Sequence, residues 1–264
     1  MFFEHIKKIC RLFRTKLYNV VFCIDCPHKY IWRCDHTDDY KGTRPESHRK
    51  NQFNSFNLFS NIKQTLLPIL QTKYNMKILK CDSCEADDII GNFAVYLANK
   101  NCNNVYILAN DNDYLQICNN TNIKLINGLG KIISNSEHKL YLGEKYLISK
   151  ILSGDISDNI KCCNIDRGFL ENGINNGHYT KIYKSILNNL LNNNDKYEIL
   201  KNILYEIRKC NSDSNSDTET ITNANTNANI FQDNKFVKNA LLMDFQMLPK
   251  ELKCNLEIKF NELV

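Results

Sequence analysis

The stretch Glu85-Ala86-Asp87-Asp88-Ile89-Ile90 decides how the rest of the chain is interpreted. Its three carboxylates lie within four positions and repel one another, so a cation is expected to hold them together. Acids in the first turn of a helix also complement the helix dipole, and the apolar residues Ile90, Ala94 and Leu97 follow at helical spacing. Taken alone, the stretch fits either a helix start or one part of a metal site.

Further acids follow the ends of other predicted segments. The apolar runs 19–24 and 105–109 have the pattern of buried parallel strands, and a polar turn follows a predicted helix at 143–152. The acids directly after these segments are Asp25, Asp111, Asp113, Asp155 and Asp158. Asp25 could equally be an ordinary turn residue. Because ligands of doubly wound sheets lie at the carboxyl ends of the strands, we expect these acids to converge.

Strands that alternate with helices predict an α/β fold with a parallel central sheet. Strands are expected at 19–25, 74–79, 105–109 and 123–126. Helices are expected at 2–17, 52–70, from 85 onward, and at 143–152, 179–193, 195–209, 236–248 and 252–264. Residues 211–229 are almost entirely Asn, Ser, Thr, Asp and Ala, which predicts a flexible insert.

The charge balance of the 264 residues is compatible with a phosphate-binding surface. The formal net charge is only +5, with 34 Lys and Arg against 29 Asp and Glu. If eight acids cluster at metal sites, the remaining 21 face 34 cations, which leaves +13 for the rest of the chain. This distribution favours an acidic site surrounded by basic surface.

Cysteine usage indicates a reducing, intracellular compartment. The chain has 12 cysteines, with no secretory signal and no apolar run of membrane-spanning length. Nucleus, organelle and viral replication site all remain open, because the amphipathic helix at 2–17 fits both a surface helix and a targeting segment. The CxxC pairs Cys23/Cys26 and Cys81/Cys84 are too far apart for a usual zinc ribbon and fit buried packing.

Cationic and aromatic side chains alternate over residues 28–50. Cations hold phosphates and aromatic faces accept unstacked bases, so this segment fits a nucleic-acid contact. Neighbouring acids partly cancel its charge, which leaves a solvated loop equally possible. The residues concerned include Arg33, Tyr40, Lys41 and Arg44.

Carboxylate oxygens suit Mg²⁺ or Mn²⁺, and two such ions ~3.5–4 Å apart can clamp an in-line phosphoryl displacement. A cation near the scissile phosphate would stabilise the charge of the transition state. Lys41 and Arg44 are the candidates for that role, and Asp111 is the central acid. A phosphotransferase with aspartates at its strand ends is a further alternative, but the Tyr40-Lys41-x-x-Arg44 segment would have no role in it.

The order and spacing of five motifs resemble the flap endonuclease and 5′-to-3′ exonuclease superfamily, and most closely its T-even phage ribonuclease H type. The motifs are Ile24-Asp25, Trp32-Arg33 with Tyr40-Lys41-x-x-Arg44, Cys84-Glu85-Ala86-Asp87-Asp88, Asp111-Asn112-Asp113, and Gly154-Asp155-x-x-Asp158-Asn159. A weaker likeness covers Asn239-x-x-Leu242-x-Asp244-Phe245.

The resemblance implies a PIN-like nuclease core over residues 1–140 and a helical, helix-3-turn-helix type DNA-binding region over 141–210. The insert then covers 211–234 and C-terminal helices cover 235–264. One magnesium ion would take Asp25, Glu85, Asp87 and Asp111, and the second Asp113, Asp155 and Asp158. Asp88 belongs to the motif as a further ligand candidate, while the contacts to nucleic acid would come from Arg33, Tyr40, Lys41 and Arg44.

The implied activity is Mg²⁺-dependent (or Mn²⁺-dependent) hydrolysis of phosphodiester bonds in DNA replication or repair. The substrates would be 5′ flaps, duplex DNA ends or RNA primers in an RNA–DNA hybrid. A monomer without membrane attachment is expected, with a replication clamp or a single-strand-binding protein as a partner by resemblance only.

One departure from the family pattern affects this interpretation. The family begins with a strand that ends in an acid, in a pattern like Leu-Ile-Asp-Gly, and the chain has no such stretch before Asp25. Either upstream coding sequence supplies it or one metal ligand is absent. The alternative function is therefore a catalytically weakened nucleic-acid-binding relative.

Overall fold

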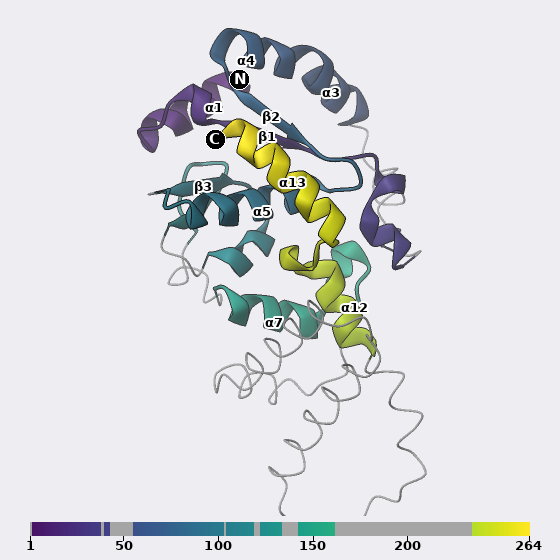
Figure 1. Ribbon diagram of the computed structural model, residues 1–264. Helices are drawn as coiled ribbons and strands as arrows, with labels where there is room; N and C mark the ends of the chain where they lie inside the picture. The colour runs from purple at the N-terminus through teal and green to yellow at the C-terminus, as the bar shows by residue number, and fades with distance from the viewer. Residues whose placement is uncertain are drawn as a thin grey trace, which may run out of the picture.

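The computed structural model describes residues 2–37, 40–42, 55–102, 104–118, 122–133, 142–161 and 234–264 (Figure 1). The strands are β1 (Val21–Ile24), β2 (Lys77–Lys80), β3 (Val105–Leu108) and β4 (Ile123–Ile126). The helices are α1 (Phe2–Leu12), α3 (Ser55–Asn61), α4 (Leu67–Tyr74), α5 (Ala86–Asn99), α7 (Glu144–Ser153), α12 (Asn234–Met243) and α13 (Lys250–Leu263). None of these described helices is both long and apolar enough to cross a membrane.

Shorter helical turns complete the described elements. A π-helical segment, η4 (Ile62–Leu66), joins α3 to α4. The 3-10 turns are η1 (Leu17–Asn19), η2 (His28–Tyr30), η3 (Trp32–Asp35), η5 (Asn112–Ile117), η6 (Ile156–Asp158) and η7 (Phe245–Met247). The helices predicted at 179–193 and 195–209 and the insert predicted at 211–234 lie almost wholly outside the described residues.

The described strands pair in parallel, as the α/β prediction requires. β1 pairs with β2, with Val21 opposite Lys77, and β3 pairs with β4, with Val105 opposite Ile123. The prediction of one central sheet differs from this result, because the described strands form two sheets of two strands each. Among the described residues, no hydrogen-bonded strand pair joins the two ladders.

Side chains of the β1–β2 sheet alternate between two apolar layers. Phe22 and Ile24 pack with α1 and α4, in a cluster centred on Leu70 and Met76. Val21 and Cys23 pack on the opposite face against α5 and α13. This alternation is the period of two that a strand buried on both faces requires.

Helix α5 connects the two sheets. Its residues Ile89 and Phe93 pack into the cluster of the β1–β2 sheet. Ala94 and Ala98 pack into the cluster of the β3–β4 sheet, together with Leu125. Because one helix is part of both cores, its first turn has a fixed position relative to the carboxyl ends of the strands.

The C-terminal segment belongs to the same packing. In Figure 1, α13 runs along α5, and the two termini of the chain lie close together. Phe260 of α13 is 1% exposed and its ring lies 4.8 Å from that of Phe93, while α12 packs on α7. The predicted C-terminal helices are therefore part of the core and do not form a separate layer.

Helix α5 packs against the C-terminal segment at Gly91. A Cβ placed on Gly91 would lie 2.5 Å from the Phe245 ring, which is itself 3% exposed and packed in the core. We therefore expect Gly91→Ala to lower the free energy of unfolding by about 1–3 kcal/mol, the usual cost of overpacking. Urea unfolding followed by circular dichroism measures this change.

The matched control is Gly128→Ala, since the nearest atom to a Cβ there is 3.6 Å away, an ordinary contact. Equal stability of the Gly91→Ala and Gly128→Ala proteins would contradict the described packing of α5 on Phe245.

Candidate metal centre

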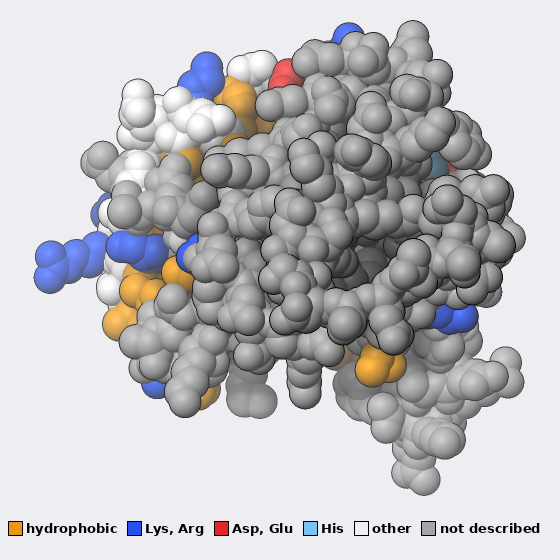
Figure 2. All heavy atoms as spheres, turned by 90° about the horizontal axis from the view of Figure 1, so that it is seen from below, with side chains coloured by type: hydrophobic (Ala, Val, Ile, Leu, Met, Phe, Trp, Pro, Cys, Tyr) orange, Lys and Arg blue, Asp and Glu red, His pale blue; other side chains and the backbone are white. Residues whose placement is uncertain are grey.

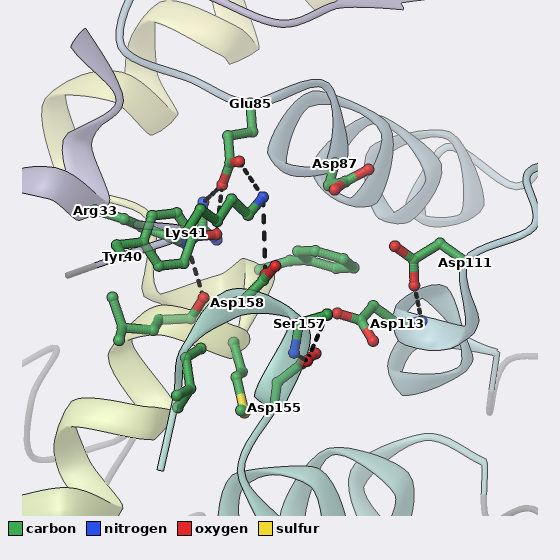
Figure 3. A pocket seen from close by; sticks show the side chains of 14 residues that line it. Arg33, Tyr40, Lys41, Glu85, Asp87, Asp111, Asp113, Asp155, Ser157 and Asp158 are labelled. Carbon is green, nitrogen blue, oxygen red and sulfur yellow. Dashed lines mark hydrogen bonds and ion pairs between the residues drawn. The ribbon is translucent and has the colours of Figure 1, made fainter. Parts of the chain in front are cut away.

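A pocket lies beyond the carboxyl ends of β2 and β3, between the starts of α5, η5 and η6 (Figure 3). Six carboxylates from three separate segments line it: Glu85, Asp87, Asp111, Asp113, Asp155 and Asp158. The rest of its wall consists of Arg33, Tyr40, Lys41, Ser157, Ile160, Leu242, Met243 and Phe245. The structure therefore brings together six of the eight acids that the sequence predicts as metal ligands.

Two of the three segments hold their acids with the same kind of turn. The Asp111 carboxylate accepts a hydrogen bond from the Asp113 backbone N–H at 2.9 Å. The Asp155 carboxylate accepts from the backbone N–H of Ser157 at 2.8 Å and from its hydroxyl at 2.6 Å. Such turns fix an aspartate on its own loop. Two backbone hydrogen bonds between Asp155 and Ile160 close the second loop.

The third segment is the start of α5. Glu85 is the N-cap residue, and its backbone N–H donates to Asp88 Oδ2 at 3.1 Å in a reciprocal capping box. Asp87 lies in the first turn, where the helix dipole favours negative charge. The helix-start interpretation of the acidic stretch is confirmed, and the same helix start places Glu85 and Asp87 in the pocket, where the metal-site interpretation stays a prediction.

Asp88 is not among the residues that line the pocket, which corrects its expected place among the metal ligands. Its side chain is fully buried, and both of its oxygens accept hydrogen bonds from Arg33 at 2.7 Å. Trp32 Nε1 donates to Asp88 Oδ2 at 3.2 Å. The carboxylate therefore serves as the partner of a buried guanidinium.

Arg33 is 2% exposed, which corrects its expected role as a contact to nucleic acid. Its Nε donates to the backbone carbonyl of Leu242 at 2.7 Å, and its Nη1 also donates to Glu85 at 3.1 Å. Burial alone would lower the pKa of Arg33, but the Asp88 carboxylate beside it raises the pKa above its ordinary value. The guanidinium is thus a permanent positive charge fixed in the wall of the pocket.

Tyr40 and Lys41 lie on the loop that the sequence predicts to contact nucleic acid, and both side chains bind pocket acids. Tyr40 Oη donates to Glu85 at 2.8 Å, and Lys41 Nζ lies 2.5 Å from Glu85 and 3.7 Å from Asp158. The Lys41 backbone N–H also donates to the Asp158 carbonyl. Arg44, the other predicted catalytic cation, lies outside the described residues.

Asp25 stands directly after β1, as predicted, but it does not line the pocket. Its side chain is exposed, and its Oδ1 accepts the backbone N–H of Ala86 at 2.8 Å. The carboxylate therefore binds the first turn of α5 in this conformation, close to the pocket but outside its lining.

Sequence reasoning missed several residues that contact the pocket acids, among them Lys150, Tyr114, Tyr146 and Ser157. Lys150 of α7 pairs with both Asp113 and Asp155, the latter at 2.9 Å. Tyr114 Oη donates to Asp87 at 2.5 Å. Tyr114 directly follows the Asp111–Asp113 motif and Lys150 lies five positions before Asp155, and these short spacings are the only available signals in the sequence.

The carboxylates divide into two electrostatic classes. Burial raises the pKa of Asp87 to about 6, helped by the neighbouring Asp111 and opposed by the Tyr114 hydroxyl. Burial likewise raises the pKa of Asp113, although Lys150 opposes it. Burial acts the same way on Asp155, but the Ser157 hydroxyl and Lys150 outweigh it and lower the pKa to about 2. Lys41 and Arg33 similarly outweigh burial and lower the pKa of Glu85.

Side-chain amides and Arg33 fix the apolar wall of the pocket. The Asn92 side chain donates to the Phe245 carbonyl at 3.0 Å. Gln116 bridges the backbone, since its Nε2 donates to the Met243 carbonyl and its Oε1 accepts from the Phe245 N–H. These bonds tie the segment after α12 to α5 and η5, so the wall keeps its position beside the acids.

The donor set fits a hard divalent cation. The six acids offer only oxygen, which Mg²⁺ and Mn²⁺ prefer. Within the described residues no three of these groups converge closely enough to enclose one ion in this conformation. That spacing suits Mg²⁺, which binds one or two carboxylates and keeps several waters. Metal ions that require all of their ligands from the protein fit this pocket less well.

Comparison with known proteins gives a family match and a fold match. The family model described as "5′-3′ exonuclease, N-terminal resolvase-like domain" matches residues 1–151, and this family consists of nucleases, which are hydrolases. No curated protein matches the chain.

Solved structures of bacteriophage T5 proteins share the fold. A T5 5′-exonuclease with bound divalent zinc ions is 14% identical with a TM-score of 0.60, covering 98% of this chain and 89% of that one. A T5 flap endonuclease in a pseudo-enzyme–product complex with DNA and metal ions is also 14% identical, with a TM-score of 0.59, covering 98% and 88%. The PIN-like α/β prediction is thereby confirmed.

Replacing Arg33 tests the buried ion pair. We expect Arg33→Met to lower the free energy of unfolding by about 3–5 kcal/mol, because Asp88 and Glu85 would be left buried without their cation. Urea unfolding at neutral pH measures the loss. Lys7→Met removes an exposed pair with Glu4 and should leave the midpoint unchanged. A midpoint shift of the same size in both proteins would contradict the role given to Arg33.

Asp87 supplies a prediction about pH. Its folded pKa of about 6 lies above the ordinary aspartate pKa of 3.8, so the folded state binds the proton more tightly. The stability of the metal-free protein therefore falls as pH rises through the window from about 4 to 6. Without divalent metal at pH 7.5, we expect Asp87→Asn to be more stable than wild type by about 1–3 kcal/mol.

Urea unfolding with EDTA at pH 4 and pH 7.5 measures this difference. Asp82→Asn, which changes an exposed acid outside the pocket, should leave the stability unchanged at both values. A less stable Asp87→Asn protein at pH 7.5 would contradict the electrostatic description of the pocket.

Proposed function

Because the chain belongs to the family of 5′-3′ exonucleases with an N-terminal resolvase-like domain, we propose that it hydrolyses phosphodiester bonds with the help of two Mg²⁺ or Mn²⁺ ions. The proposed substrates are 5′ flaps, duplex DNA ends and RNA primers paired with DNA. The observation that carries the proposal is the convergence of six carboxylates from three segments in one pocket.

The charge of the pocket supports two divalent ions. Together with Asp88, seven carboxylates face three described cations, Arg33, Lys41 and Lys150. The deficit of four charges equals the charge of two Mg²⁺ ions. Such ions would supply charge stabilisation for the phosphate and a bound water of lowered pKa. We propose that one ion lies among Glu85, Asp87 and Asp111 and the other among Asp113, Asp155 and Asp158, each bound directly by one or two of these carboxylates and by the rest through water.

The chain's own residues have separate tasks in this proposal. Lys41 Nζ lies between Glu85 and Asp158, on two sides of the pocket, where an ammonium group can contact the scissile phosphate and stabilise its charge. Tyr40 orients Glu85 through its hydroxyl. Leu242, Met243 and Phe245 form an apolar side of the pocket, which restricts water on that side.

Two further observations support a DNA substrate. The printed description of one T5 relative with this fold names DNA and metal ions together. On the face shown in Figure 2, Lys and Arg predominate over Asp and Glu among the described side chains that are visible. The acidic pocket and the cations on this visible face agree with the charge distribution inferred from the sequence.

The second candidate function is a nucleic-acid-binding relative with weak catalysis. The position of Asp25 favours it, because the only acid at the end of β1 binds the start of α5 and leaves the first proposed metal group with three acids. Binding to a 5′-flap duplex without Mg²⁺-dependent cleavage would establish this candidate and exclude the first.

Replacing Asp111 tests the proposal directly. We expect Asp111→Asn to reduce cleavage of a 5′-flap DNA by at least about a hundredfold, because a proposed ligand of the first metal ion loses its charge. Binding to the same duplex in Ca²⁺ should be retained. The rate is measured on fluorescently labelled flap, blunt duplex and RNA-primed substrates over a Mg²⁺ titration.

The control is Glu257→Gln on the exposed side of α13, which should cleave at the wild-type rate. Unchanged turnover by Asp111→Asn, or wild-type cleavage that persists in EDTA, would overturn the metal assignment.

A further inference from the structure

Tyr114 connects the core of the protein to one of the pocket acids. It lies in η5, is 1% exposed and packs in the same apolar cluster as Leu125 and Phe245. Its ring lies 5.6 Å from that of Phe245, which lines the pocket. Its hydroxyl donates to Asp87 Oδ1 at 2.5 Å. A side chain with an apolar body fixed in the core thus carries a single polar atom to Asp87.

The hydroxyl has no packing task of its own. A phenylalanine would fill the apolar cluster equally well, whereas a buried hydroxyl is tolerated only with a partner. The phenolic hydroxyl finds that partner in Asp87, to which it donates its hydrogen.

The second oxygen of Asp87 is the one available to a cation. Among the described residues, Oδ2 has no hydrogen-bond partner, and Asp87 and Asp111 lie on the same side of the pocket in Figure 3. A donor on Oδ1 fixes the rotation of the carboxylate and withdraws part of its negative charge from the neighbouring Asp111. Partners of this kind commonly change metal affinity or activity by 10–100-fold when removed.

The other two tyrosines at the pocket differ from Tyr114. Tyr40 reaches Glu85 from a loop, and Tyr146 reaches Asp113 only at 3.5 Å. The Tyr114 contact is shorter than either and comes from a side chain held on all sides by the core. The direction of Asp87 is therefore set by a side chain of the apolar core.

We propose that Tyr114 is a positioning residue that holds Asp87 with Oδ2 directed at a divalent cation. This inference rests on the proposed function, because it takes Asp87 as a metal ligand. Tyr114 itself touches neither metal nor substrate in this proposal and acts only through the carboxylate.

The test is Tyr114→Phe, which removes one oxygen and keeps the ring. Binding of Mn²⁺ to the full-length protein without nucleic acid is measured by electron paramagnetic resonance. We expect about tenfold weaker binding of one ion, cleavage restored by excess Mn²⁺, and an unchanged KM for flap DNA. A purely structural defect would not be rescued by metal. Tyr96→Phe, which removes a hydroxyl bonded to Asn261 outside the pocket, should match wild type.

A double-mutant cycle with Asp87→Asn keeps the inference falsifiable even if Tyr114→Phe is less stable. If Tyr114 acts through Asp87, adding Tyr114→Phe to Asp87→Asn should change Mn²⁺ affinity no further. Wild-type affinity in Tyr114→Phe, or an equal loss in both backgrounds, would overturn the inference. Wild-type protein that binds no Mn²⁺ would instead overturn the proposed function.

Discussion

The buried ion pair between Arg33 and Asp88 is the interaction on which the pocket depends. Arg33 uses both ends of its guanidinium fork on Asp88, reaches Glu85 with one nitrogen and binds the Leu242 carbonyl with another. It therefore links the loop after β1, the start of α5 and the end of α12. A bidentate pair has one geometry, so it fixes orientation in a way that a point charge cannot.

Further donors and cations explain how the fold can gather six carboxylates. Each acid has a donor or cation that does not depend on a bound metal: Lys41 and Tyr40 for Glu85, Tyr114 for Asp87, the Asp113 backbone N–H for Asp111, Lys150 for Asp113, the Ser157 hydroxyl for Asp155, and Lys41 for Asp158. The unfavourable burial of charge that remains is concentrated at Asp87 and Asp113, whose pKa values are raised by burial and further by the neighbouring Asp111. Stability is lower there and the capacity to bind a cation is higher, which is the usual balance at functional sites.

Sequence patterns predicted the strand ends well, because apolar runs followed by acids report burial and chain direction together. The patterns could not show which of the adjacent acids, Asp87 or Asp88, lines the pocket. Successive residues of a helix point about 100° apart, so adjacent acids cannot both face one pocket, and which one does depends on where the helix begins. Here Glu85 caps the helix, and Asp88, at the third helical position, turns toward Arg33.

Other features were beyond sequence reasoning for a different reason. Lys150 and Tyr114 contact the acids only because the packed structure brings their helices close. Patterns of apolar and polar residues do not predict such side-chain contacts. The burial of Arg33 was missed because a cation beside an aromatic residue fits both a surface contact and a buried pair. The split into two parallel sheets was missed because strand patterns say which segments are strands and not which of them pair.

We propose that this pocket holds two divalent ions between its carboxylate groups. Anomalous diffraction from crystals soaked in Mn²⁺ measures this most directly. We expect two manganese peaks ~3.5–4 Å apart, one beside Asp87 and Asp111 and one beside Asp113, Asp155 and Asp158. Crystals without a peak in the pocket, at a Mn²⁺ concentration that supports cleavage in solution, would contradict it.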